Sequence, residues 1–153
     1  MENARILKSV FMFRGLSQIQ LAQFNKVMRS REVRAGERLV EEGAPADSMF
    51  IILDGRFLVT KQLDNGREET VAEFGPGEHF GEIGMIDRGP RSATVVAHSD
   101  GEVLELSRDD FERILDGFPE LRIRVYENFL ESLCERLRLS NENLLLVTRE
   151  PSG

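Results

Sequence analysis

Two charged residues, Glu82 and Arg91, stand in the segment of the sequence that is richest in binding chemistry, FGEIGMIDRGPRSATV from Phe80 to Val95. The guanidinium of Arg91 presents a planar fork that can donate hydrogen bonds to two phosphate oxygens at once, which the ammonium of a lysine cannot do. The carboxylate of Glu82 can accept a hydrogen bond from a sugar hydroxyl, and such a bond to a shielded charged group is worth roughly 1.5–3 kcal/mol. The segment therefore predicts a site for a ligand that carries both a phosphate and a free hydroxyl.

Glycine and proline residues around this pair suit a close approach between backbone and ligand. Gly77, Gly81 and Gly84 lack a Cβ atom, so the chain can lie close to a ligand or to neighbouring backbone at these points. Pro90 restricts the backbone immediately before Arg91. A short helix near Gly81 would add backbone N–H groups, which are good donors to an anion.

The chain from Arg31 to Ser107 consists of short apolar or alternating runs that turn residues interrupt about every ten residues. Such spacing is typical of a β-sandwich or barrel and not of a parallel sheet. The dipeptide Asn65-Gly66 is the strongest hairpin signal. The strands that we expect are Met49–Leu53, Phe57–Thr60, Glu69–Phe74, Ala93–Ala97 and Val103–Leu106.

Helical patterns flank this region on both sides. Apolar residues up to Met28 recur at helical spacing with an interruption at Gly15, and Ser17 is well placed to cap the second of two short helices. After the last strand the pattern is helical again, breaks at Gly117 and Pro119, and then continues to about residue 148. A long final helix therefore follows the β-region.

The long final helix has two apolar faces. One face, with Leu121, Val125 and Phe129, suits packing against the helix's own β-region. The other face repeats at heptad spacing, which is typical of helices that pair, and Ser140 is its polar exception. We therefore expect a parallel homodimer through this helix. The heptad face consists of Ile123, Tyr126, Leu130, Leu133, Leu137, Ser140, Leu144 and Val147.

The segment from Phe80 to Val95 resembles the phosphate-binding cassette of cyclic-nucleotide-binding domains, as found in the catabolite activator protein, cyclic-nucleotide-dependent kinases and gated channels. That cassette reads roughly Phe-Gly-Glu-Leu-Ala-Leu, a few residues, then Pro-Arg-x-Ala-Thr, and FGEIGMI, DRG and PRSAT match it nearly position for position. The resemblance extends to FRGLS at Phe13–Ser17, to the Gly36-Glu37 turn with Gly43, and to the MFIILDG strand that ends at Gly55.

The resemblance implies one α+β, mainly β domain over residues 1–153, with a double-stranded β-helix, or jelly roll, at its centre. Its parts would be N-terminal helices over 1–30, the β-roll over 31–107 with the cassette at 80–95, and C-terminal helices over 108–148. Within the cassette, Glu82 would hold the ribose 2′-hydroxyl and Arg91 the phosphate. Further phosphate contacts would come from Gly81, Ile83 and Ser92.

Outside the cassette, the resemblance implies contacts to the purine. In the catabolite activator protein the last helix supplies a Thr-Ser pair to the adenine, and LCERLRLSNENL aligns with that helix so that Ser140 and Asn141 take these positions. The remaining residues that the resemblance implies are Arg136, paired with Glu82, and Val71 and Phe74 along the purine wall.

The identity of the nucleotide is expected to be cAMP. Ser92 follows the arginine at a position where cGMP-selective members of the family often carry threonine, whereas serine occurs there in the cAMP-binding activator. A serine hydroxyl can still serve guanine, so a cGMP sensor remains the alternative ligand assignment. The resemblance implies a sensor that signals by rearrangement of its last helix to an unknown effector protein.

Three other function classes fit the sequence less well. An enzyme is not expected, because His79 and His98 are the only histidines and form no His-x-His or His-Asp pair for a catalytic metal. Direct DNA binding is not expected, because only residues 149–153 follow the long helix and leave no room for a helix-turn-helix. An interaction module that no longer binds nucleotide remains an alternative, and the intact Glu82 and Arg91 argue against it.

Composition limits the remaining classes. The net charge of −7 is spread over residues of mixed sign, so attraction to a nucleic acid or to an anionic membrane is not expected. The apolar run from Val10 to Phe13 is too short for a signal peptide or a membrane span, which favours the cytoplasm. Cys134 is the only cysteine, so no intramolecular disulfide forms, and we expect a half-buried thiol. No cofactor or metal is implied.

Overall fold

Two antiparallel sheets of four strands each form the β-region of the computed structural model, which describes residues 3–149. The strand orders are β1-β8-β3-β6 and β2-β7-β4-β5, so neighbours in a sheet are mostly distant in sequence, as the expected jelly roll requires. The strands are β1 (Arg29–Val33), β2 (Arg38–Val40), β3 (Ser48–Asp54), β4 (Phe57–Gln62), β5 (Glu68–Phe74), β6 (His79–Phe80), β7 (Thr94–Ala97) and β8 (Gly101–Ser107).

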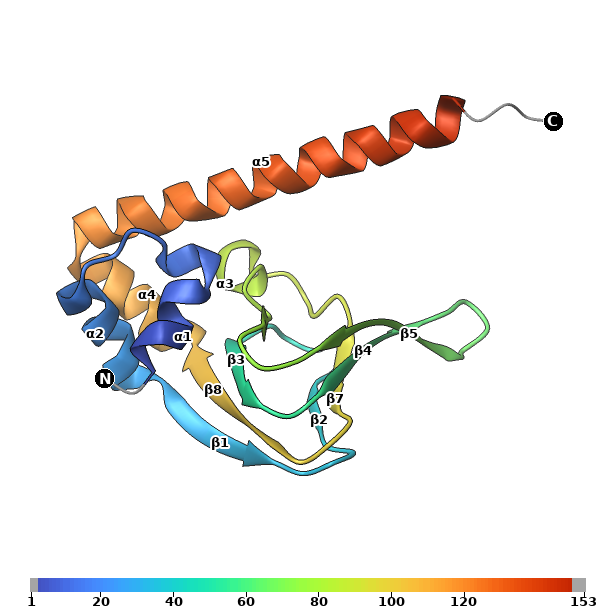
Figure 1. Ribbon diagram of the computed structural model, residues 1–153, viewed down its shortest axis with the longest axis horizontal. Coiled ribbons are helices and arrows are strands. Elements are labelled where there is room, and N and C mark those ends of the chain that lie inside the picture. The colour runs from blue at the N-terminus through green and yellow to red at the C-terminus, as the bar shows by residue number, and fades with distance from the viewer. Residues whose placement is uncertain (1–2, 150–153) are drawn as a thin grey trace.

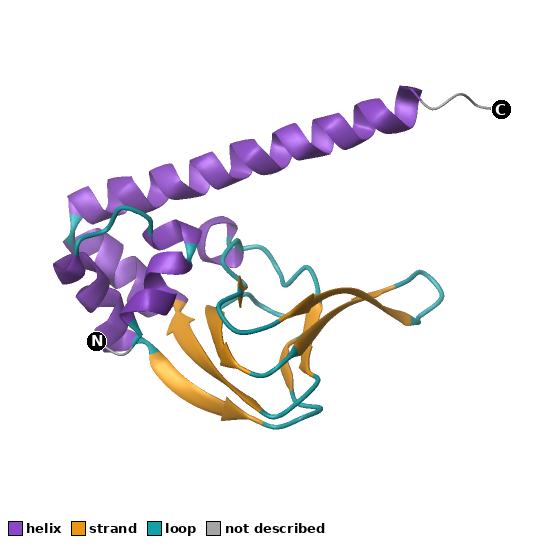
Figure 2. Cartoon of the chain, in the orientation of Figure 1, coloured by secondary structure: helices purple, strands orange, loops and turns teal. Residues whose placement is uncertain are grey.

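The first sheet is the middle layer of the molecule, between the helices and the second sheet (Figure 2). Strand β3 shows why, because its side chains alternate between two separate cores. Met49 and Ile51 pack with the helices, whereas Phe50 and Ile52 pack with the second sheet. Burial on both faces accounts for the nearly continuous apolar run of this strand.

The helices gather at one end of the β-region (Figure 1). Local signals set their boundaries. Ser17 and Gln20 form a capping box at the start of the helix that begins at Gln18, and the Ser107 hydroxyl accepts a hydrogen bond from Asp110 N at the start of the helix that begins at Arg108. The helices are α1 (Ala4–Ser9), the 3₁₀-helix η1 (Phe11–Phe13), α2 (Gln18–Val27), α3 (Gly84–Asp87), α4 (Arg108–Gly117) and α5 (Pro119–Arg149).

Helix α5 is attached to the domain only along its first part and then extends beyond the helical end of the domain, above the β-region (Figure 1). Leu121, Val125 and Phe129 are buried, as expected for the face that packs on the domain. Asn128 is also buried, and its Nδ2 donates to Met12 O at 3.0 Å and to Arg14 O at 2.9 Å. Because each buried amide donor finds a partner, these contacts fix α5 against η1.

Farther along α5 the side chains face solvent. The prediction that Cys134 is half-buried was wrong, because Cys134 is exposed on α5. Large apolar side chains of the heptad face are also exposed: Ile123, Tyr126, Leu130, Leu133 and Leu137. The side chains of Leu144 and Val147, which complete the expected heptad face, lie outside the described part of the structure.

The expected Asn65-Gly66 hairpin joins β4 and β5. Gly66 has φ +82°, the left-handed conformation that glycine adopts without strain, and the Asn65 side chain accepts a hydrogen bond from Arg67 N at 3.0 Å. Across residues 3–149, no helix has the length and apolar composition that crossing a membrane requires.

Candidate functional site

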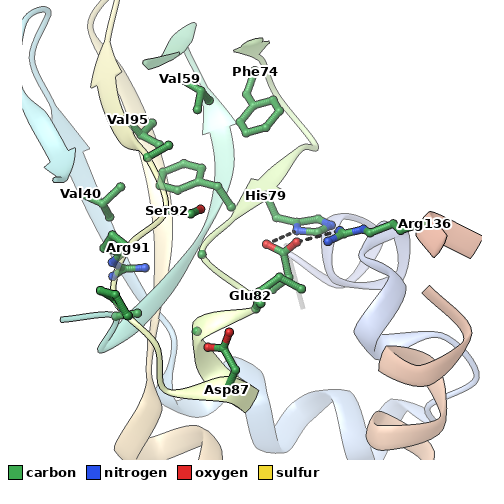
Figure 3. Close-up of a pocket in the computed structure, with 17 residues that line it drawn as sticks. Val40, Val59, Phe74, His79, Glu82, Asp87, Arg91, Ser92, Val95 and Arg136 are labelled. Atoms are coloured by element: carbon green, nitrogen blue, oxygen red, sulfur yellow. Dashed lines mark hydrogen bonds and ion pairs between the residues drawn. The ribbon is translucent and has the colours of Figure 1, made fainter. Parts of the chain in front are cut away.

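A pocket of about 300 Å³ lies between the second sheet, the segment that follows β6, and helix α5 (Figure 3). Part of its lining is apolar and suits a flat aromatic base, whereas the rest carries polar and charged groups. The apolar wall includes Val40, Val59, Phe74, Phe80 and Val95, and the polar side includes His79, Glu82, Asp87, Arg91, Ser92 and Arg136.

Arg91 is buried at the bottom of this pocket, with 8% of its surface exposed. Its Nη1 donates to Ser48 O at 2.7 Å, and its Nη2 donates to Ser48 Oγ at 3.2 Å and lies 3.5 Å from Asp47 Oδ1. Burial lowers the pKa of the Arg91 guanidinium, and the nearby positive charge of Arg108 adds to this effect, while Asp47 and Glu105 oppose it. The group stays charged, because an arginine loses its proton only far above neutral pH.

Glu82 is the second buried charged group of the pocket, with 7% of its surface exposed. Its Oε1 accepts a hydrogen bond from Arg136 Nη2 at 3.2 Å, and its Oε2 lies 3.4 Å from His79 Nδ1 (Figure 3). Burial raises the pKa of the Glu82 carboxyl, but the contacts with His79, with its own backbone N–H and with Arg136 outweigh burial and hold the pKa below its usual range. Glu82 is therefore ionised at neutral pH and ready to accept a hydrogen bond.

The lowered pKa of Glu82 predicts a pH-dependent contribution to stability. A depressed folded-state pKa stabilises the folded protein above the ordinary carboxyl pKa of 4.5, and this contribution is lost as the pH falls through the folded-state value. We therefore expect the difference in unfolding free energy between wild type and Glu82→Gln to shrink when urea unfolding is repeated from about pH 7 down to about pH 3. The exposed Glu69→Gln serves as a matched control; a pH-independent difference for Glu82→Gln would contradict the assignment.

The glycines of the segment have separate roles. Gly81 has φ +86°, and a Cβ atom there would lie 2.7 Å from Arg91 Nη1 and 3.0 Å from Ser48 O, so only glycine leaves room for the arginine. Gly84 begins α3, and a Cβ atom there would lie 2.4 Å from the Cβ of Ala46. Gly84 therefore serves contact with the neighbouring chain, whereas Gly81 serves the position of Arg91.

The structure brings together most of the residues that the sequence singled out. Gly81, Glu82, Ile83, Arg91, Ser92, Phe74 and Arg136 all line the pocket. Val71 does not, because its side chain is 52% exposed on β5. Ser140 and Asn141 are exposed on α5 beyond Arg136 and do not line the pocket of this single chain. Their expected contacts to a purine stay predictions.

Two residues near the site were not foreseen as part of it. His79 was set aside as an isolated histidine, although its position three residues before Glu82 was visible in the sequence. Arg108 donates from Nη2 to Gly84 O at 3.0 Å and to Ala46 O, so it fixes the start of α3 from the first residue of α4. No sequence signal connects Arg108 with the cassette. Within residues 3–149, no group of three histidine, cysteine or acidic side chains is arranged to hold a metal ion.

Several known proteins are similar to this chain. A CRP-like cAMP-activated global transcriptional regulator of Mycobacterium tuberculosis is 28% identical over 148 residues, which make up 95% of this chain and 64% of the regulator. The crystal structure of a cyclic nucleotide-binding domain from Methylobacillus flagellatus superposes with a TM-score of 0.78 at 30% identity, covering 99% of this chain and 85% of that one. The regulatory domain of Toxoplasma gondii PKA, crystallised with cAMP, superposes with a TM-score of 0.69 at 34% identity, covering 72% of this chain and 42% of that one.

The sequence model of the cyclic nucleotide-binding domain matches residues 30–118, which is more than half of the chain. The matched residues contain both sheets except Arg29, and the pocket residues from Val40 to Val95, including the buried Glu82 and Arg91. This chain therefore belongs to the family of cyclic nucleotide-binding domains.

Proposed function

We propose that the protein is a sensor that binds a cyclic nucleotide, preferably cAMP, in the pocket beside α3. One observation carries the proposal: Arg91 and Glu82 are both buried, both charged and both face the same pocket, beside an apolar wall. Charged side chains are rarely buried unless their interactions repay the loss of hydration. A phosphate for Arg91, a 2′-hydroxyl for Glu82 and a flat base for the wall make one ligand that uses all three features.

The preference for cAMP over cGMP rests on Ser92 and on similarity. Ser92 lines the pocket next to Arg91. The Mycobacterium tuberculosis relative is named as cAMP-activated, and the Toxoplasma gondii relative was crystallised with cAMP. Calorimetry with each nucleotide tests both levels of the proposal. Tighter binding of cAMP supports the proposal, whereas tighter binding of cGMP would make cGMP the ligand. Binding of neither nucleotide favours an interaction module that no longer binds nucleotide.

We further propose that α5 transmits the bound state to an effector protein. The helix contacts the ribose side of the pocket through Arg136, whose guanidinium is half-exposed. A hydrogen bond to a charged group is worth about 1.5–3 kcal/mol, whereas shifting a two-state equilibrium from 1:99 to 99:1 needs about 5.5 kcal/mol. Arg136 alone is therefore too weak a switch. Ser140 and Asn141 are the residues that we propose add ligand contacts in the signalling position, and hydrogen exchange along residues 119–148 with and without cAMP tests this step.

A homodimer through the exposed heptad face of α5 is part of the proposal. Leu130 and Leu137 are 62% and 63% exposed, which is unfavourable for leucine in a single chain in water. A parallel second copy would bury this face and bring a second α5 next to Ser140. DNA binding is not part of the proposal, and the expected cytoplasmic location stays a prediction.

The dimer leads to a matched pair of variants. Leu137→Glu places a charge in the heptad seam and is expected to convert the dimer to a monomer, because burying a charge without a partner is costly. Leu139→Glu makes the same chemical change at a leucine that is 55% exposed but lies outside the seam, so it should leave the dimer intact. Analytical ultracentrifugation measures both. A wild-type protein that sediments as a monomer would end the dimer proposal.

A further inference from the structure

His79 has an unusual environment for an isolated histidine. It lies on β6 with a side chain that is only 19% exposed. Its buried Nδ1 makes no hydrogen bond of normal geometry within the described residues, yet this nitrogen lies 3.4 Å from Oε2 of Glu82. In Figure 3 the imidazole and the guanidinium of Arg136 approach the same carboxylate. A buried polar atom that is aimed at the ribose-binding carboxylate needs an explanation other than packing.

The two oxygens of Glu82 have partners of different kinds. Oε1 faces Arg136, which comes from α5 and has a half-exposed, flexible side chain. Oε2 faces His79, which comes from the same strand and loop as Glu82 itself. A carboxylate only accepts hydrogen bonds, so the Nδ1 that faces it must carry the proton, and this holds for the neutral ring and for the charged ring alike. His79 can therefore hold Oε2 even when Arg136 releases Oε1.

The ring of His79 is itself held by aromatic contacts. Its centroid lies 5.4 Å from that of Phe11 in η1. Phe11 in turn packs edge-to-face on Phe129 of α5, with ring centroids 5.1 Å apart and an interplanar angle of 83°. Ring pairs at these distances are attractive and restrict each other's orientation. The contact with Phe11 therefore helps to keep Nδ1 of His79 directed toward Glu82.

We propose that His79 is a positioning residue of the ribose site: its Nδ1–H holds one oxygen of Glu82 so that the carboxylate is kept in the orientation that accepts the ligand's 2′-hydroxyl. This inference rests on the proposed function and deepens it, because it makes His79 a determinant of the preference for ribose over 2′-deoxyribose. A side chain that acts only as packing would support both sugars equally.

Two substitutions distinguish the effect of the Nδ1–H donor from the effect of the ring's packing. His79→Phe keeps an aromatic ring against Phe11 but removes the donor, whereas His79→Asn places an amide N–H where Nδ1 is and removes most of the ring. The probes are cAMP and 2′-deoxy-cAMP, measured by calorimetry on wild type and both variants. We expect His79→Phe to bind cAMP about tenfold more weakly and 2′-deoxy-cAMP within about twofold of wild type, because only the first ligand uses the oriented carboxylate. His79→Asn should keep the discrimination within about threefold of the wild-type ratio.

The outcomes separate this inference from the proposed function. A wild type that binds neither ligand contradicts the proposed function itself. A wild type that prefers cAMP, together with a His79→Phe variant that prefers it equally or loses affinity for both ligands equally, overturns the role of His79 and leaves the function standing. If thermal unfolding shows that His79→Phe is not folded, His79→Met takes its place, because methionine also lacks the N–H donor and adapts to irregular space.

Discussion

Replacing Arg91 with lysine is expected to weaken cyclic-nucleotide binding by about a hundredfold, although the charge is kept. A lysine ammonium cannot present two parallel N–H groups to two phosphate oxygens, so the bidentate contact is lost. The loss of two hydrogen bonds to a charged group, at about 1.5 kcal/mol each, corresponds to about a hundredfold in affinity. Arg91→Ala should lose still more affinity, because a buried phosphate would then have no counter-charge. Calorimetry with cAMP measures both variants.

The exposed Arg67→Ala provides a control for the loss of one positive charge at the surface. It should bind cAMP with nearly unchanged affinity, since exposed charges are screened by salt. Thermal unfolding belongs to the same experiment, because Arg91 also donates to Ser48 O and Ser48 Oγ. Wild-type affinity in Arg91→Lys would show that the phosphate is held by other groups.

Gly81→Ala is expected to destabilise the fold and to remove most of the nucleotide binding. Two effects add at this position: φ is +86°, which costs a residue with a Cβ about 1–2 kcal/mol, and the new Cβ would meet Arg91 Nη1 at 2.7 Å and Ser48 O at 3.0 Å. The arginine must then move from the place where it meets the phosphate. We expect binding to fall by about a hundredfold, as for the loss of the bidentate contact.

Gly77→Ala is the matched control for this prediction. Gly77 has nearly the same backbone conformation, with φ +88°, but a Cβ atom there would meet nothing within 4 Å. The variant should therefore lose about 1–2 kcal/mol of stability and keep its affinity for cAMP. Chemical denaturation and calorimetry on the two alanine variants separate backbone strain from displacement of Arg91. Equal losses of affinity at both positions would contradict the role assigned to Gly81.

The sequence predicted five of the eight strands of the described structure and missed β1, β2 and β6, which all lie at the edge of a sheet. Strand β3 was recognised from its apolar run, and β4, β5, β7 and β8 were recognised from alternation or turn signals. Strand β1 reads RSREV and has four exposed residues, because it is the edge strand of its sheet. An edge strand is often protected by charges, so the feature that suits it to its place also hides it from hydrophobic patterning.

The residues of the site also differ in how far the sequence alone predicts them. Glu82 and Arg91 could be predicted because their segment resembles a known cassette and lies within one short stretch of sequence. Ser48, which accepts hydrogen bonds from Arg91, lies 43 residues away in sequence, and its contact depends on how the strands pair. The role of His79 was missed for another reason, because an isolated histidine carries no pattern until the carboxylate beside it is known.

The attachment of α5 through Asn128 has a mechanical consequence. The buried amide ties the helix to η1 at one point, and about 30 Å of helix extends from there to Arg149. Arg136 lies about 12 Å from that point, so the helix acts as a lever with an arm ratio of roughly 2.5. A displacement of 2 Å at Arg136 would move the far end of a rigid α5 by about 5 Å, nearly the pitch of one helical turn. If the protein binds and signals as proposed, a small adjustment beside Arg136 would become a movement large enough for another protein to detect.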